Sequence, residues 1–185
     1  MHFLHKCLFS IKQITPQSWT VSLLYKEPVK RVEKQLKQFD KKQSVVILEN
    51  SARTAEEAAA SLKCEVGAII KSLLFKTDEK FILCLIAGDK KASLNKIKKT
   101  FNIKDISMAP ANDVKNITGF TIGGVSPIGH LNKIPILIDN SLERFTNLFA
   151  AAGHPNCVFK INFEDLRKIT NGLTKEITEW NNQDY

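Results

Sequence analysis

The chain has 185 residues, of which 43% are hydrophobic and 25% are charged, and its formal net charge is +8. These values are typical of a globular protein of one domain with a proper core. The longest apolar run, residues 81–87, is too short to span a bilayer. The first nine residues lack the sustained apolar centre and the cleavage site of a signal peptide, so we expect a cytoplasmic protein without a membrane span.

The cysteines and histidines exclude the common metal motifs. The four cysteines contain no CxxC pair, and neither they nor the four histidines have the spacing of zinc ligands. Cys84 lies inside the apolar run, which favours a buried free thiol. We therefore expect no disulfide, no structural metal and no cofactor.

The positive charge is unevenly distributed. Residues 1–42 carry +6 of the net charge of +8, and a second group of lysines occupies residues 90–104. Such clusters suit a polyanion that is bound through its phosphates. A solvated lysine-rich surface would have the same composition.

The N-terminal third predicts an arm, two helices and a strand. Residues 1–27 show no strong periodicity and are predicted to be an arm of unknown role. An amphipathic helix is predicted from Pro28, because apolar residues recur at three- and four-residue spacing as far as Phe39. Residues 44–48 predict a strand, and a capping box at Thr54-Ala55-Glu56-Glu57 begins an alanine-rich helix.

The remainder mixes strands and helices. Runs 68–75 and 81–87, separated by a polar five-residue loop, predict a hairpin. Three further helices are predicted: one at 94–101 with Ser93 as a candidate N-cap, one from Pro110 to before Gly119, and one from Asn162 to Gly172. A strand is predicted at 134–139, and a polar turn follows it. Because strands and helices do not alternate regularly, we predict a single mixed α+β domain over residues 28–180.

A glycine-rich loop, Gly123-Gly124-Val125-Ser126-Pro127-Ile128-Gly129-His130, lies between two apolar runs. Glycine leaves the main chain uncovered and accepts positive φ, so several N–H groups can converge on one ligand atom. A rigid frame that carries a bare loop is a common layout for a binding or catalytic site. A plain strand connector would have the same composition.

Four side chains could carry chemistry, and each has a simpler interpretation. Lys71 interrupts an apolar run, so it either extends to solvent at a sheet edge or holds an anion in a pocket. Asp139 either caps the turn after its strand or orients a lysine or a substrate amine. His130 follows the loop and His154 lies in a predicted small-residue turn over 150–155, so each is either a surface residue or a proton donor.

Familiar nucleophile and metal motifs are missing. The sequence contains no GxSxG, no HExxH, no Walker loop and no paired-carboxylate motif. An enzyme built from these residues would therefore position a substrate and a water molecule near backbone donors.

Taken in order, these segments resemble the YbaK/ProX family, whose domain is also found inserted in many bacterial prolyl-tRNA synthetases. The resemblance runs from about Val29 to Glu179. It is carried by the ordered set Thr54–Ala59, Ile69–Phe75, Ala87–Asp89, Thr118–Phe120, Gly123–His130, Pro135–Asp139 and Ala151–Gly153.

The resemblance implies a curved, partly barrel-like mixed sheet surrounded by helices. It also implies a trans-editing aminoacyl-tRNA deacylase, a hydrolase that removes a wrong amino acid from the 3′ end of tRNA. In the family, the lysine that matches Lys71 lies near the terminal adenosine, the GxxxP loop matched by Gly123 and Pro127 positions the ester, and the aspartate matched by Asp139 supports the pocket. The catalytic candidates are thus Lys71, Gly123, Gly124, Ser126 and Asp139, and the substrate-binding candidates are Ser72, Val125, Pro127, Gly129, His130, Gly153 and His154.

Position 72 departs from the family pattern, because it is serine where subfamilies carry threonine or asparagine. We expect this position to influence the choice of amino acid, and small or polar residues such as serine, threonine, alanine or cysteine are the expected substrates. The expected partners are the acceptor end of a mischarged tRNA and, as a second candidate, an aminoacyl-tRNA synthetase. The alternatives are a non-catalytic tRNA-binding or synthetase-associated module, and a hydrolase of small free esters.

Overall fold

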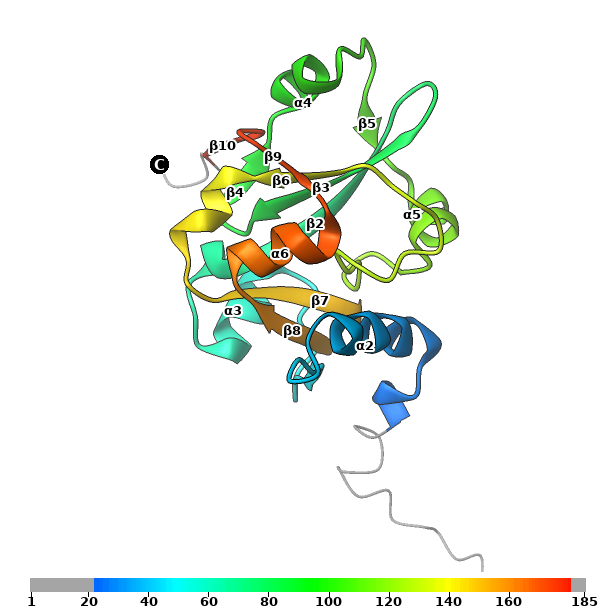
Figure 1. Cartoon of the computed structure of the whole chain (residues 1–185). Coiled ribbons are helices and arrows are strands. Elements are labelled where there is room, and N and C mark those ends of the chain that lie inside the picture. The colour runs from blue at the N-terminus through cyan, green and yellow to red at the C-terminus, as the bar shows by residue number, and fades with distance from the viewer. Residues whose placement is uncertain (1–21, 181–185) are drawn as a thin grey trace, which may run out of the picture.

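The computed structural model describes residues 22–180, so most of the predicted arm lies outside the described residues. The chain forms a large mixed sheet with helices packed around it (Figure 1). The strands follow one another across this sheet as β1 (Val46–Ile47), β8 (Cys157–Ile161), β7 (Leu148–His154), β2 (Ile69–Lys76), β3 (Phe81–Ala87), β6 (Ile136–Asp139) and β9 (Leu173–Lys175).

Shorter elements complete the fold. Strand β5 (Ser107–Met108) pairs with the end of β2, and β4 (Lys90–Ala92) forms a separate two-stranded sheet with β10 (Thr178–Trp180). The helices are α2 (Glu27–Phe39), α3 (Ala55–Leu62), α4 (Leu94–Phe101), α5 (Ala111–Thr118) and α6 (Phe163–Thr170), with 3-10 turns η1 (Val66–Ala68) and η2 (Asn140–Arg144).

The pairing confirms the predicted α+β class. Strands β2 and β3 form the predicted antiparallel hairpin, whereas β7 is parallel to β2 and β6 is parallel to β3. Strand β3 is continuously apolar because both of its faces are covered. Alternate residues enter two cores, one with Leu83, Leu85 and Ala87 and the other with Ile82, Cys84 and Ile86.

The helix signals are also confirmed. Helix α2 buries Val29, Val32 and Leu36, which form the predicted apolar stripe. At the start of α3 the Thr54 hydroxyl accepts from the Glu57 amide, which completes the predicted capping box. Helix α5 ends at Thr118 and is capped by Gly119, whose φ of 78° is the left-handed conformation that glycine favours. The predicted strand at 44–48 is shorter than expected, since only Val46 and Ile47 pair with β8.

The prediction of a small-residue turn over 150–155 is wrong. These residues instead continue β7 as far as His154, and the turn to β8 begins at Pro155. Alanine and glycine have low strand propensity, but packing against neighbours overrides it here. A Cβ atom on Gly153 would come within 2.8 Å of the Pro28 carbonyl carbon, so the small residues let the start of α2 lie directly on this strand.

One side of strand β2 is paired with other strands only at its two ends. Strand β7 pairs with Ile69 and Ile70, and β5 pairs with Phe75 and Lys76, whereas β3 accompanies β2 along its other side from Ile70 to Lys76. Residues 71–74 therefore have a neighbouring strand on one side only. The opening between β7 and β5 is where the cavity described below is found.

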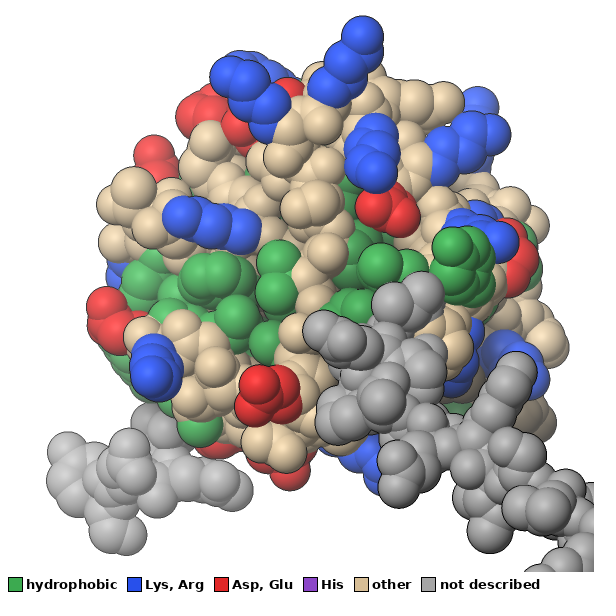
Figure 2. Space-filling view, turned by 90° about the horizontal axis from the view of Figure 1, so that it is seen from below, with side chains coloured by type: hydrophobic (Ala, Val, Ile, Leu, Met, Phe, Trp, Pro, Cys, Tyr) green, Lys and Arg blue, Asp and Glu red, His purple; other side chains and the backbone are tan. Residues whose placement is uncertain are grey.

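The surface carries scattered positive charge. Figure 2 shows a face on which hydrophobic side chains form a band, with Lys and Arg side chains around it and acidic side chains between them. Among residues 22–180 no helix is long and apolar enough to cross a membrane.

We predict that Gly153→Ala destabilises the protein by more than Gly123→Ala. Both glycines have positive φ, 85° and 87°, at which a side chain costs about 1–2 kcal/mol. A Cβ at Gly123 would meet nothing closer than 3.8 Å, whereas one at Gly153 would overlap the backbone of Pro28. Overpacking of this kind adds about 1–3 kcal/mol. Urea unfolding of both variants measures the difference, and equal losses would contradict the close approach of α2 and β7.

Candidate functional site

A cavity of about 340 Å³ adjoins the interrupted edge of β2. Its walls come from five parts of the chain: the segment leading into α3 together with α3 itself, strand β2, the stretch from β5 into α5, the glycine-rich loop, and the β7–β8 hairpin. Most of its lining side chains are small or apolar, among them Ala55, Ala58, Ala150, Ala151 and Val158. A concave, mainly apolar site with a few polar groups is the usual form of a small-ligand pocket.

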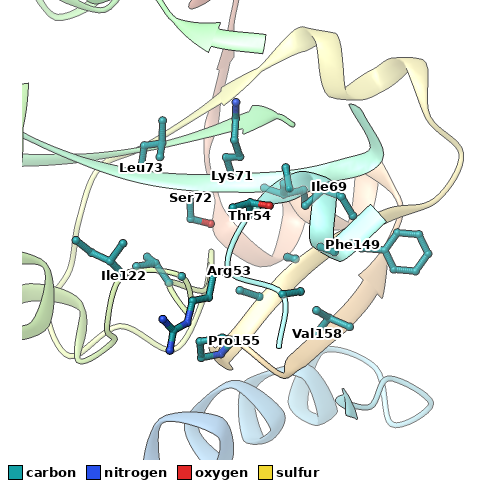
Figure 3. Close-up of a pocket in the computed structure, with 18 of the residues that line it drawn as sticks. Arg53, Thr54, Ile69, Lys71, Ser72, Leu73, Ile122, Phe149, Pro155 and Val158 are labelled. Carbon is teal, nitrogen blue, oxygen red and sulfur yellow. The ribbon is translucent and has the colours of Figure 1, made fainter. Parts of the chain in front are cut away.

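Lys71 and Ser72 both line this cavity, but their side chains leave opposite faces of β2 (Figure 3). The Ser72 hydroxyl lies on the side of Arg53 and Ile122. It is buried and has no hydrogen-bond partner within the described residues. A buried hydroxyl without a partner costs free energy, so it marks a position where a ligand can supply the missing hydrogen bond.

The Lys71 ammonium lies away from the glycine-rich loop. It donates to the backbone carbonyl of Gly88 at 3.0 Å and also to that of Lys90. Burial lowers the pKa of Lys71, while the carboxylates of Glu56 and Asp89 oppose that shift. An ammonium has three N–H donors, so one remains after these two carbonyls are bound. The expected role of Lys71 at a substrate phosphate stays a prediction.

The loop brings two free amide groups to the cavity wall. Gly123 and Val125 both line the cavity, and their backbone N–H groups donate to no acceptor among residues 22–180. The N–H of Gly124 between them is used by the carbonyl of Thr121 at 2.9 Å. Unpaired amides that lie close together in a loop can stabilise a developing negative charge on a substrate oxygen.

Helix α2 holds this loop in place. The Gly129 amide donates to the Gln35 side chain at 2.8 Å, and the Arg31 Nε donates to the Gly129 carbonyl at 2.9 Å. The same guanidinium donates to the carbonyl of Gly119 and lies over the ring of Phe120. One arginine therefore fixes both ends of the segment that carries the candidate amides.

Several predicted site residues lie behind the cavity rather than in its wall. The Ser126 side chain is fully buried, and its hydroxyl accepts from the Ile128 amide at 3.4 Å. His130 Nε2 lies 2.7 Å from the Ser126 carbonyl oxygen, which can only accept, so this nitrogen carries the proton. Pro127, which is buried, and Gly129, which is half-buried, belong to the same part of the loop and do not line the cavity.

Asp139, also predicted, is fully buried at the end of β6. Its carboxylate accepts from the amides of Ser141 at 3.0 Å and Ile177 at 2.8 Å. It thus caps the turn, as the simpler interpretation proposed, and also ties the segment before β10 to the sheet. It is not among the residues that line the cavity.

Gly124, Gly153 and His154 form a close contact beside the cavity. A Cβ atom on Gly124 would lie 3.0 Å from the Cα of His154, so the glycine allows the loop to lie against the end of β7. The His154 Nδ1 accepts from the Asn156 amide at 3.2 Å, and the Lys26 ammonium lies 3.3 Å from its Nε2. Burial and then Lys26 lower the pKa of His154, which favours a neutral ring.

Two cavity residues had no clear signal in the sequence. Arg53 lines the mouth, and its stem lies beside Gly123, but it only precedes a capping box in the sequence. Cys157 lines the inner wall, and burial raises the pKa of its thiol to about 11, so the thiol stays protonated at neutral pH. Within residues 22–180 no three His, Cys, Asp or Glu side chains are grouped as metal ligands.

Comparison with known proteins agrees with the family resemblance. A family model of the aminoacyl-tRNA editing domain matches residues 49–169. The uncharacterized protein YwhH of Bacillus subtilis is 32% identical over 143 residues, which cover 77% of this chain and 90% of that protein. A proline–tRNA ligase of Caldicellulosiruptor bescii is 33% identical over 129 residues, which cover 65% of this chain but only 22% of the ligase. A crystal structure of a candidate trans-editing enzyme for prolyl tRNA synthetase has a TM-score of 0.78 and 32% identity, covering 83% of this chain and 98% of that one.

We predict that the protein loses stability as the pH falls from about 7 to about 5, partly through His130. Burial lowers the pKa of His130 in the folded protein, the hydrogen bond to the Ser126 carbonyl opposes this shift, and Arg31 adds to it. The unfolded chain, with a histidine pKa of about 6.5, then binds more protons than the folded chain, so folding stability rises with pH in this range. His130→Gln keeps a donor for the Ser126 carbonyl and should flatten this dependence in urea unfolding. An unchanged dependence would show that His130 is not the group responsible.

Proposed function

Because the chain belongs to the aminoacyl-tRNA editing domain family, we propose that it hydrolyses the ester between a wrongly attached amino acid and the 3′ end of a tRNA. The observation that carries the proposal is the set of unpartnered polar groups at the cavity wall: the Ser72 hydroxyl and the amides of Gly123 and Val125. The cavity volume of about 340 Å³ is at the small end of the roughly 300–1,000 Å³ found for ligand sites, which suits a small aminoacyl group.

In the proposed reaction the ester carbonyl oxygen accepts from the Gly123 and Val125 amides. A water oxygen attacks the carbonyl carbon, the bond to the ribose oxygen breaks, and a proton from the water passes to that oxygen. The products are the free amino acid and a tRNA with its terminal hydroxyl restored. Removing a donor of this kind costs about 10²–10³ in rate in characterised hydrolases.

The described side chains offer no protein nucleophile at the cavity. Its cysteine, Cys157, is held as a neutral thiol by burial. Its hydroxyls, which include Ser72 and Thr54, have no histidine beside them, since His130 and His154 do not line the cavity. An aminoacyl ester is already activated, so a positioned water molecule, or a hydroxyl or thiol of the substrate itself, suffices as the nucleophile.

Lys71 would hold the terminal nucleotide in this proposal. Two of its N–H groups bind the β3–β4 turn, and the third would donate to a phosphate oxygen of the tRNA. The substrate would reach this protein after the synthetase that mischarged the tRNA has released it. The tRNA would be the main binding partner, and a synthetase would be a second partner. The reaction would take place in the cytoplasm, where tRNA is charged.

Binding without turnover would favour the alternative, a tRNA-binding or synthetase-associated module. Equal hydrolysis of free aminoacyl esters and aminoacyl-tRNA would favour a small-ester hydrolase. A deacylation panel of tRNAs charged with serine, threonine, alanine and cysteine, together with the free esters, separates all three. Turnover that requires the tRNA supports the proposal.

We predict that Lys71→Ala lowers kcat/KM for deacylation by at least about tenfold, because charge-assisted hydrogen bonds contribute about 1.5–3 kcal/mol. Lys76→Ala is the matched control, since Lys76 lies on the same strand but is exposed and pairs with Asp113. Thermal unfolding of both variants checks that the fold survives. If folded Lys71→Ala is as active as the wild type, the proposed role of this lysine is wrong.

Ser72→Ala should change which amino acid is removed. If the Ser72 hydroxyl binds a polar substrate side chain, the ratio of kcat/KM for seryl- over alanyl-tRNA falls by about three- to tenfold in the variant. Ser107→Ala, at an exposed position of β5, should leave the ratio unchanged. A ratio that is unaffected by Ser72→Ala would place the substrate side chain elsewhere in the cavity.

A further inference from the structure

The two-stranded sheet of β4 and β10 presents an exposed indole on a positively charged surface. Strands β4 and β10 lie side by side (Figure 1). Trp180 pairs with Lys90 in the register of these strands, so the two side chains lie on the same face. The Lys90 ammonium is 2.9 Å from the centroid of the Trp180 ring. Trp180 is nevertheless 61% exposed, whereas Lys90 is buried with only 8% of its surface exposed.

Arg144 adds a second cation beside the same ring. Its guanidinium carbon is 5.5 Å from the Trp180 ring centroid. The Nε of Arg144 donates to the Ser141 carbonyl, and its Nη2 donates to both oxygens of Asp89. The remaining Nη1 has no hydrogen-bond acceptor within residues 22–180, so it is available to an incoming anion. We call Trp180, Lys90 and Arg144 the indole platform.

The indole platform is connected to the cavity through Lys71. The Lys71 ammonium donates to the carbonyl oxygen of Lys90, whose side chain lies against Trp180. Lys71 also lines the cavity. Lys71 therefore joins the cavity wall to the strand that carries Lys90.

The charges around the platform favour an anionic partner. The acidic neighbours of these cations include Asp89, which is already paired with Arg144, and the buried Asp139, whose carboxylate accepts from two backbone amides. Glu179 lies on the opposite face of the two-stranded sheet beside Lys91. Glu176, close in sequence to β10, is paired with Lys96. An aromatic face beside cations is the arrangement that binds single-stranded nucleic acid, in which the ring stacks on a base and the cations meet the phosphates.

We propose that the indole platform stacks an unpaired base of the single-stranded 3′ end of an RNA, with Arg144 Nη1 at the adjacent phosphate. This inference rests on the proposed function, since it concerns the nucleotides that precede the ester. It adds a base-binding position outside the cavity. Duplex RNA, whose bases are already stacked on one another, should not use this position.

The test measures binding to uncharged RNA, so it does not depend on hydrolysis. The chain contains two tryptophans, Trp19 and Trp180, and Trp19→Phe therefore leaves Trp180 as the sole indole emitter. In that background the single-stranded trinucleotide cytidine-cytidine-adenosine should quench the emission. A blunt RNA hairpin without an overhang should leave it nearly unchanged.

Affinities from equilibrium dialysis with labelled trinucleotide extend the test to variants without the indole. Trp180→Ala should weaken binding by about tenfold, because base–aromatic stacking is worth about 1–3 kcal/mol. Trp180→Phe, which keeps an aromatic face, should bind the trinucleotide nearly as tightly as the wild type. Tyr25→Ala is the matched control, since Tyr25 is 68% exposed and has the Lys30 ammonium 5.2 Å from its ring centroid.

The inference is overturned if the wild type does not bind the trinucleotide, if Trp180→Ala binds it as tightly as the wild type, or if the hairpin binds equally well. It is also overturned if Trp180→Phe loses as much affinity for the trinucleotide as Trp180→Ala, because the loss of affinity would then come from a change of structure and not from loss of the aromatic face. Deacylation of charged tRNA by the same proteins separates the two proposals. Binding without turnover contradicts the proposed function alone, and turnover that is insensitive to Trp180 contradicts the platform alone.

Discussion

Strand β2 has hydrogen-bonded neighbours on both sides only near its two ends, and this interruption determines where the cavity can form. Strands β7 and β5 each pair with two residues of β2 and then diverge from it. The central residues of β2 remain fixed by β3, so the opening has one rigid wall. Any change that lengthened β5 or β7 along β2 would close the opening from the side.

The polar groups of the site are held from several directions. Helix α2 fixes the glycine-rich loop through Arg31 and Gln35, and the β3–β4 turn is fixed by the Lys71 ammonium. The unpartnered Ser72 hydroxyl and loop amides stand between these supports. This is a preorganised arrangement, in which the donors are already oriented before a ligand arrives and need little rearrangement to bind it.

The sequence was most informative where local interactions decide the structure. The capping box at Thr54 and the glycine that ends α5 are local features, and both are confirmed. The strand through Ala150 and Gly153 was not predictable from local sequence. Its small residues leave room for the start of α2, which is distant in the sequence. The pairing of β4 with β10 is equally non-local, so the position of Trp180 beside Lys90 carried no sequence signal.

The candidate site was predicted in part, for the same reason. Lys71, Ser72, Gly123 and Val125 do line one cavity, although fifty residues lie between the pair on β2 and the pair in the loop. The direction of the Lys71 side chain depends on the alternation of β2 and on carbonyls in a later turn, which no local pattern specifies. Ser126 and His130 belong to the same motif as Gly123, but their side chains hold the loop together rather than line the cavity.

The position of α2 has a practical consequence for work with fragments. The family match covers residues 49–169, yet Arg31 and Gln35, which anchor the loop, precede it. A recombinant piece trimmed to the matched range would also expose the apolar residues that α2 covers. These contacts make α2 part of the packed unit, so the N-terminal boundary of a fragment follows from packing rather than from the matched range.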